Sequence, residues 1–167
     1  MTPIRTRRRH VNPRAHVQVG FTLIELLVVV LVLSILVGIA IPAYQRYTIR
    51  GKMAEVMSAI AGCRTAIADV YLSGASAPGA NAWGCENSAA PNKYVASVST
   101  DENGVVTVTA NGFRDPAVDG KKIQLIPYKT ATEKMAAADV GNSIFKWACE
   151  PGSPGVPRQY LPKSCSE

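Results

Sequence analysis

Residues 21–41 read FTLIELLVVVLVLSILVGIAI, and Glu25 carries the only ionisable side chain among these 21 residues. As an α-helix, which rises about 1.5 Å per residue, this segment would extend roughly 31 Å, enough to cross the hydrocarbon core of a bilayer. Pro42 follows directly, and a proline inside a helix lacks the backbone donor and clashes with the preceding turn. The sequence therefore predicts a membrane-spanning helix with a kink between Gly38 and Pro42.

The positive charge of the chain lies mostly before this apolar segment. Of the 18 lysines and arginines, five precede residue 21, whereas none of the 12 acidic residues does, so the remaining chain has a net charge of only +1. A nucleic-acid-binding surface spread over the folded part is therefore not indicated. The five basic residues are typical of a topology or targeting signal and favour a cytoplasmic N-terminus. They are Arg5, Arg7, Arg8, Arg9 and Arg14.

The apolar segment is compatible with two processing schemes. In the first, a conventional signal peptidase cuts after Ala40, where Gly38-Ile39-Ala40 has small residues at the required places, and releases a soluble chain. The segment is longer than a usual signal-peptide core and Pro42 lies just behind that cut, so this scheme is disfavoured. In the second scheme, cleavage between Gly20 and Phe21 leaves a new amino group at the same end of the helix as Glu25.

Glu25 requires a compensating group, because a carboxyl group within an apolar helix is costly in lipid. The new amino group of a neighbouring subunit would provide one. The alternative is that the Glu25 side chain extends to the lipid headgroups.

The residues after position 20 lack the usual components of a catalytic or cofactor site. Both histidines, His10 and His16, precede that position, which excludes a Ser/His/Asp or Cys/His pair from the rest of the chain. No glycine-rich phosphate loop or dinucleotide fingerprint occurs. No enzymatic activity, cofactor or metal is therefore expected.

All four cysteines follow the apolar segment, as expected for an oxidising periplasm or cell surface. They contain no Cys-x-x-Cys pair, which argues against a zinc cluster. Of the three ways to pair them, we favour Cys63 with Cys85 and Cys149 with Cys165, because both pairs close short local loops. Closing the proline-rich loop of the second pair would stabilise the fold by roughly 3 kcal/mol.

Residues 43–72 predict an amphipathic helix that packs on a sheet. Four β-rich runs follow, and the first two are joined by a hairpin with its tight turn at Asn103-Gly104. One long helix and about four strands indicate an α+β fold with an antiparallel sheet packed on the helix. The apolar stripe of the helix comprises Tyr47, Met53, Val56, Met57, Ile60, Cys63, Ile67 and Val70, and the runs are residues 94–99, 105–109, 122–128 and 143–149.

The stretch Gly20-Phe21-Thr22-Leu23-Ile24-Glu25-Leu26, placed after a short basic leader and opening a long apolar helix, resembles the signature of type IV pilins. The resemblance implies that a prepilin peptidase cuts after Gly20 and N-methylates Phe21. It also implies that Glu25 helps subunits to dock by complementing the amino group of a neighbour. The helix would first anchor the subunit in the inner membrane and then pack in the core of a filament, where the stretch around Pro42 is expected to lose helical structure.

The end of the chain resembles the same family. The sequence Gln159-Tyr160-Leu161-Pro162-Lys163-Ser164-Cys165 is similar to the close of type IVa subunits, whose D-region is a disulfide-bound segment. The implied organisation is a leader at residues 1–20 that is removed, a hydrophobic helix at residues 21–42 and a globular head at residues 43–167. The head would comprise an amphipathic helix (43–73), an αβ-loop (74–93), the sheet (94–149) and the D-region (149–165), with the αβ-loop and D-region at the filament surface.

The function that the resemblance implies is that of a type IVa major pilin, a structural subunit of a surface filament used for adhesion, twitching motility and DNA uptake. Its expected partners are other copies of itself, the inner membrane, prepilin peptidase, the pilus assembly machinery, and a host receptor or DNA bound through the assembled filament. The precursor would be a single-pass inner-membrane protein with a cytoplasmic N-terminus and a periplasmic head, and the mature protein would be extracellular.

Two alternatives remain open. A minor pilin or a pseudopilin of type II secretion shares the N-terminal signature, although pseudopilins usually lack a terminal disulfide loop such as that between Cys149 and Cys165. In the second alternative the protein is a surface binding module whose D-region recognises a receptor or DNA, with Arg158 and Lys163 as a local basic patch.

Overall fold

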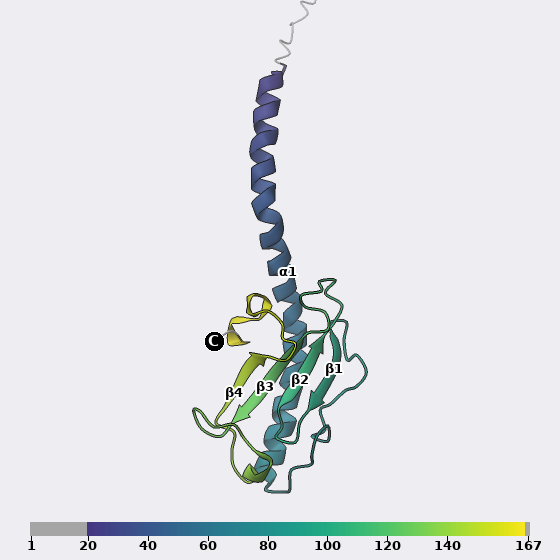
Figure 1. Cartoon of the computed structure of the whole chain (residues 1–167), viewed down its shortest axis with the longest axis vertical. Helices are drawn as coiled ribbons and strands as arrows, with labels where there is room; N and C mark the ends of the chain where they lie inside the picture. The colour runs from purple at the N-terminus through teal and green to yellow at the C-terminus, as the bar shows by residue number, and fades with distance from the viewer. Residues whose placement is uncertain (1–19, 166–167) are drawn as a thin grey trace, which may run out of the picture. The chain divides into compact units, whose positions relative to one another are not determined.

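The computed structural model describes residues 20–165 and contains one long helix followed by four strands (Figure 1). The predicted leader up to residue 19, with both histidines, lies outside the described residues. The chain divides into two compact units between Ala40 and Ile41. The elements are α1 (Leu23–Ser73), β1 (Val95–Thr100), β2 (Val106–Ala110), β3 (Lys122–Tyr128) and β4 (Lys146–Pro151), with short 3-10 helices η1 (Ala137–Asp139), η2 (Arg158–Tyr160) and η3 (Lys163–Cys165).

The part of α1 in the head buries one face of the helix. Its buried side chains recur every three or four residues, which places them on a single stripe. They are Ile49, Met53, Val56, Ile60, Cys63, Ile67 and Tyr71. The predicted stripe is confirmed in its centre but wrong at Tyr47, which is 76% exposed. Tyr47 lies two positions before Ile49, which is about 200° around the helix, so Tyr47 lies on the opposite face.

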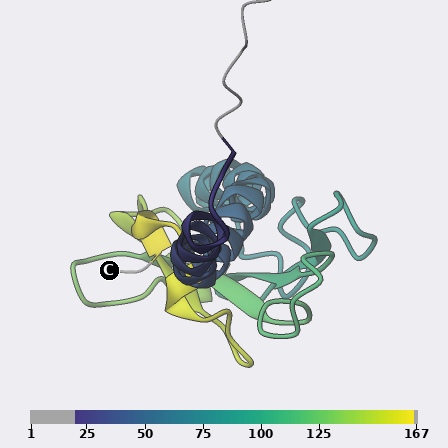
Figure 2. The ribbon, with the colours of Figure 1, turned by 90° about the horizontal axis from the view of Figure 1, so that it is seen from above.

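The four strands form the predicted antiparallel sheet, in the order β1-β2-β3-β4. Along β2 the buried residues Val106, Val108 and Ala110 alternate with threonines, as expected when one sheet face is covered. The covered face packs on α1 in a common core (Figures 1 and 2). This arrangement is the α+β fold that the order of elements predicts.

Strand β4 begins later than predicted. The predicted strand starts at residue 143, but Lys146 is the first residue of β4, and Phe145 is 66% exposed. Lys146 pairs with Tyr128, the last residue of β3. The Phe145 N–H still donates to the Tyr128 carbonyl oxygen at 2.8 Å, but β3 has no further residue with which an earlier part of the chain could pair. The length of β3, rather than the local sequence, therefore decides where β4 starts.

The β1–β2 connection differs in type from the predicted tight turn. A two-residue type I′ turn at Asn103-Gly104 needs a positive φ at both residues. Gly104 has a positive φ of 69°, but the φ of Asn103 is not positive. The Asp101 carboxylate orders a longer turn instead, since it accepts hydrogen bonds from the N–H groups of Asn103 at 2.9 Å and Val105 at 2.7 Å.

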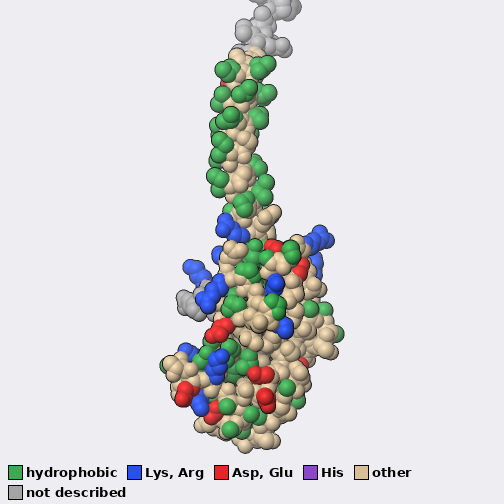
Figure 3. Space-filling model, in the orientation of Figure 1, with side chains coloured by type: hydrophobic (Ala, Val, Ile, Leu, Met, Phe, Trp, Pro, Cys, Tyr) green, Lys and Arg blue, Asp and Glu red, His purple; other side chains and the backbone are tan. Residues whose placement is uncertain are grey.

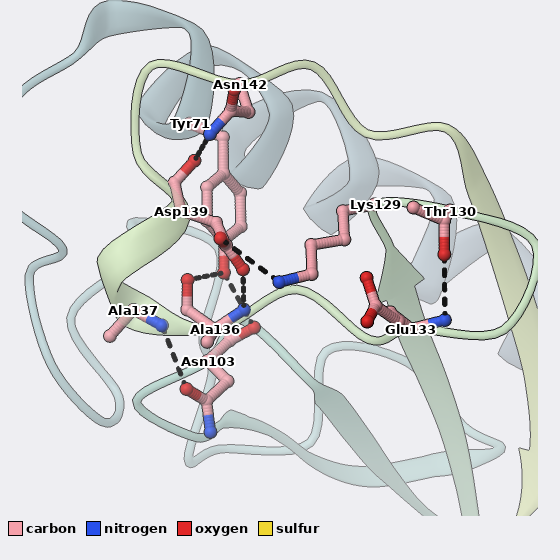
Figure 4. A network of polar contacts seen from close by, with 9 residues as sticks. All are labelled: Tyr71, Asn103, Lys129, Thr130, Glu133, Ala136, Ala137, Asp139 and Asn142. Atoms are coloured by element: carbon pink, nitrogen blue, oxygen red, sulfur yellow. Dashed lines mark hydrogen bonds and ion pairs between the residues drawn. The ribbon is translucent and has the colours of Figure 1, made fainter.

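Tyr71 joins the end of α1 to the β1–β2 turn and to the loop between β3 and β4 (Figure 4). Its hydroxyl donates to the carbonyl oxygen of Asn103 at 3.0 Å, and the carbonyl oxygen of Ala136 lies at 3.4 Å. Burial, with the nearby carboxylates of Asp139 and Asp101, raises the pKa of Tyr71 to about 12. The folded chain thus keeps the phenol protonated at a pH where an unfolded chain loses the proton.

This difference predicts a loss of stability in alkali that Tyr71→Phe should remove. Below pH 10 the contribution of Tyr71 is fully present, and between its ordinary pKa of 10.0 and its folded pKa of about 12 it is lost. The slope is at most about 1.4 kcal/mol per pH unit. Chemical unfolding of the full chain in detergent at about pH 8 and about pH 11 measures it. Tyr47→Phe, at an exposed position, is the control, and an equal alkaline loss in Tyr71→Phe and wild type would contradict the prediction.

Candidate functional site

The described apolar segment exposes its large side chains. Between Phe21 and Ile41 these side chains are 48% to 82% exposed, and Figure 3 shows them along the visible face of α1. Among the described helices, α1 is long and apolar enough to cross a membrane. So much contiguous apolar surface is unfavourable in water. Lipid tails or other protein helices must therefore cover it.

Thr22 caps the first turn of α1. Its hydroxyl accepts a hydrogen bond from the Glu25 N–H at 3.3 Å, and its carbonyl oxygen accepts one from the Leu26 N–H at 3.2 Å. Sequence reasoning missed this role of Thr22, although the spacing Thr-x-x-Glu is the signal of a capping box. Within residues 20–165 the Glu25 carboxylate has no hydrogen-bond or ion-pair partner. The described residues therefore offer this carboxylate no partner.

Gly20 and Phe21 precede α1, and both are exposed. Cleavage of the peptide bond between them stays a prediction. An amino group created at Phe21 would lie next to the capped turn that contains Glu25.

Pro42 lies inside α1, which is one helix from Leu23 to Ser73. Because proline has no backbone N–H, the Gly38 carbonyl lacks its usual helical donor. The helix does not end there, and a kink between Gly38 and Pro42 stays a prediction. This turn therefore has one backbone hydrogen bond fewer than an ordinary turn in the interior of a helix.

The D-region is a loop closed by a disulfide between Cys149, on β4, and Cys165, in η3. Two apolar side chains within the loop, Val156 and Leu161, are 1% and 2% exposed and belong to the core of the head. The loop, yellow in Figure 1, is therefore anchored at its two ends and at two points between them.

The backbone of the D-region also pairs with the start of β3. The Lys122 N–H donates to the Pro154 carbonyl oxygen at 2.7 Å, and the Lys122 carbonyl oxygen accepts from the N–H of Gly152 at 2.9 Å and of Val156 at 3.2 Å. A Cβ on Gly152 would lie 2.7 Å from the Lys122 Cβ. Only glycine allows this close approach of the two backbones.

The αβ-loop is tied to α1 by the second disulfide, between Cys63 and Cys85. Inside the loop the Glu86 carboxylate accepts hydrogen bonds from the Thr100 hydroxyl and, at 2.8 Å, from the Trp83 N–H. Burial by itself would raise the pKa of Glu86, but these hydrogen bonds outweigh it and hold the pKa below its ordinary value. This contribution to the order of the loop is present at neutral pH and is lost as the pH falls through the lowered pKa.

Other acidic side chains of the head also bind backbone groups. Asp119 accepts hydrogen bonds from the N–H groups of Phe113 at 2.8 Å and Arg114 at 2.9 Å, and Asp139 accepts one from Ala136 at 2.8 Å. In the part of the chain that the structure describes, no group of three His, Cys, Asp or Glu side chains could hold a metal ion. These carboxylates stabilise loops.

Two protein families match different parts of the chain, and several known proteins are similar to most of it. Residues 49–166 match the family model of pilins, described as bacterial filament proteins, and residues 18–41 match the prokaryotic N-terminal methylation motif. The fimbrial protein EcpC of Eikenella corrodens is 35% identical over 153 residues, which cover 89% of this chain and 91% of that protein. A fimbrial protein of Neisseria meningitidis serogroup B is 39% identical over 135 residues (79% and 72%). The type IV major pilin protein PilE of Neisseria gonorrhoeae is 40% identical over 111 residues (65% and 66%).

Proposed function

Because the chain belongs to the pilin family of bacterial filament proteins, we propose that it is the major subunit of a type IV pilus. Pilins are structural subunits that assemble with copies of themselves, and they are not enzymes. The observation that carries the proposal is the exposed apolar part of α1, which lies within the matched N-terminal methylation motif. The similarity to fimbrial proteins over most of the chain supports it.

Assembly moves the apolar part of α1 from lipid into a bundle of identical helices. Lipid tails are as apolar as leucine side chains, so this transfer gains little from apolar surface and does not by itself select a register. The Glu25 carboxylate does select one, because a charge in a medium of low dielectric constant is stable only near an opposite charge. We propose that its partner is the Phe21 amino group of a neighbouring subunit.

Before assembly, the subunit is a precursor anchored in the membrane by α1. We propose that its N-terminus is cytoplasmic, because basic residues precede the apolar segment, and that the head lies in the periplasm. The two disulfides of the head agree with that oxidising compartment. Prepilin peptidase and the pilus assembly machinery are the partners at this stage.

In the filament, the D-region and the αβ-loop would face outward. Each is held by a disulfide, and the backbone of the D-region is held in addition by Lys122. Such loops tolerate changes of exposed side chains without loss of the fold. We propose that adhesion, twitching motility and DNA uptake use the assembled filament, which would bind a host receptor or DNA as a whole.

The alternative of a minor pilin or pseudopilin is less well supported. The D-region is closed by the Cys149–Cys165 disulfide, which pseudopilins usually lack. Moreover, the relatives at 35% to 40% identity are named fimbrial proteins or major pilins.

The proposal predicts the N-terminus and the abundance of the mature protein. Filaments sheared from producing cells should contain this chain as the main protein. It should begin at Phe21 and carry one methyl group more than the unmodified chain. Edman degradation and intact-mass measurement of the sheared fraction test both points.

The contrary results are equally specific. A mature chain that begins at Ile41 would mean cleavage by a conventional signal peptidase and would refute the filament role. A chain that begins at methylated Phe21 but is scarce in the sheared fraction would identify a minor subunit instead.

A further inference from the structure

One face of α1 lines a cavity just after the apolar segment. Ala43, Arg46, Tyr47 and Arg50 follow one another at intervals of three, one and three residues, which places them on the same side of the helix. Together with Gln159 of the D-region they line a cavity of about 250 Å³. This face lies roughly 100° around the helix from the buried stripe that begins at Ile49. The residues that line the cavity are all exposed, so they do not belong to the core of the head.

The two arginines bring uncompensated positive charge to this cavity. The Arg46 Nε donates to the Pro42 carbonyl oxygen at 3.3 Å, and the Arg50 Nε donates to the Gln159 carbonyl oxygen at 2.8 Å. Neither guanidinium group has an ion-pair partner among residues 20–165. Each side chain is thus positioned by a backbone oxygen, while its charge remains for an anion from outside.

The aromatic residues of this turn are exposed as well. Tyr44 is 69% exposed and Tyr47 is 76% exposed, directly after the last apolar residue, Ile41. Tyrosines and arginines that follow an apolar helix are typical of the boundary between membrane and water, where the ring sits at headgroup level. The composition of the face therefore fits the surface of a bilayer.

The spacing along the helix fits the same location. Arg46 lies five residues after Ile41, or about 7–8 Å along the axis, and Arg50 lies about 13–14 Å along it. The polar layer of a bilayer is about 5–8 Å thick on each side. Helical side chains lean toward the N-terminus of their helix, and the Arg46 Nε does so, since it contacts the Pro42 carbonyl oxygen one turn earlier. Arg46 therefore lies at the depth of the lipid phosphates, and the Arg50 side chain, held beside Gln159 one turn further on, can extend toward the same layer.

We propose that Arg46, Tyr47 and Arg50 bind the headgroup of an anionic phospholipid in the leaflet where α1 leaves the membrane. The two guanidinium groups contact the phosphate, and Tyr47 with Ala43 covers the glycerol and upper acyl region. This inference rests on the proposed function, since it requires a precursor anchored by α1. The lipid holds the precursor until the subunit leaves the bilayer, when the face becomes free.

The test measures lipid binding by the full processed chain, purified from membranes in a mild detergent. An equal mixture of phosphatidylglycerol and phosphatidylethanolamine is added, and native mass spectrometry gives the ratio of the two lipid-bound forms. We expect wild type to prefer phosphatidylglycerol on the order of 30-fold. Arg46→Gln/Arg50→Gln should reduce this preference for phosphatidylglycerol to about threefold or less. Arg46→Lys/Arg50→Lys keeps the charge and should retain most of the preference.

A matched control removes the same charge elsewhere in the head. Lys129→Gln/Lys134→Gln, in the loop between β3 and β4, should keep the wild-type preference. A wild type without preference, or an equal loss in this control, would overturn the site. Displacement of the lipid by an equal concentration of inorganic phosphate would show a site for a soluble anion. An arginine-dependent dimer in place of the lipid adduct would show that the face takes a second copy, and both results overturn the proposal.

Membrane insertion, measured on the same chain by carbonate extraction, distinguishes failure of the proposed function from failure of the lipid site. A chain that does not insert counts against the proposed function. A chain that inserts but binds both lipids equally counts against the lipid site alone.

Discussion

Glu25→Ala is expected to leave the precursor in the membrane and to lower the number of surface filaments by at least about tenfold. The substitution removes the only charge of the apolar segment, so insertion into lipid becomes more favourable. With the proposed pairing, the filament would then bury the Phe21 amino group of a neighbour without its partner, and breaking a buried ion pair costs about 3–5 kcal/mol. Membrane fractions and sheared surface fractions, each quantified by immunoblot, measure the two effects separately.

Two further variants separate charge from shape. Glu25→Gln keeps the length of the side chain and the N–H bond to Thr22 but lacks the charge, so it should also assemble poorly. Glu55→Ala removes an exposed carboxylate from the same helix within the head and should assemble like wild type. Normal filament numbers with Glu25→Ala would remove carboxylate-amine pairing from the assembly mechanism.

Loss of a disulfide has the largest expected effect on the stability of the head, and the D-region disulfide is considered first. Cys149→Ser/Cys165→Ser should lower the free energy of unfolding by about 3 kcal/mol, because the unfolded chain regains the freedom of a closed loop. The double substitution avoids leaving a reactive thiol. Chemical unfolding of the full chain in detergent measures the change, and limited proteolysis with mass analysis should place new cuts between residues 150 and 164.

The other disulfide provides the matched control. Cys63→Ser/Cys85→Ser opens a loop of similar size, with a sequence separation of 22 compared with 16, so the loss of stability should be similar. Its new cuts should fall in the αβ-loop instead. If the Cys149→Ser/Cys165→Ser variant unfolds at the wild-type denaturant concentration and resists protease, the hydrogen bonds of Lys122 hold the D-region without the disulfide.

The elements with strong local signals were predictable. Strand β3 was predicted at residues 122–128 and is Lys122–Tyr128, because its two isoleucines, its leucine and its tyrosine favour a strand. The centre of the buried stripe of α1 was predictable from its period for a similar reason. The errors occurred at the ends of elements. Tyr47 is out of phase with the stripe and lies on the other side of the helix from the buried Ile49. At residue 143 the predicted strand began before β3 offered a partner.

The residues of the candidate site were predictable where a local motif marks them, and not where a contact joins distant parts of the chain. The positions of Gly20, Phe21 and Glu25 follow from a motif read along the chain, and the pairing of the cysteines follows from short loops. Thr22 was missed although its spacing to Glu25 is a known capping signal. The place of Arg50 beside Gln159 had no local signal, because 109 residues separate them.

The sequence by itself determined the length of the apolar segment, the place of its one carboxylate, and the order of one helix and four strands. These properties depend on composition and on distances along a single element, which covalent geometry sets. Only the tertiary structure decided which face of α1 is covered, how Lys122 holds the D-region, and why Arg50 points its charge into a cavity. Each of these depends on residues that are distant in the chain and meet only when the helix and the sheet pack together.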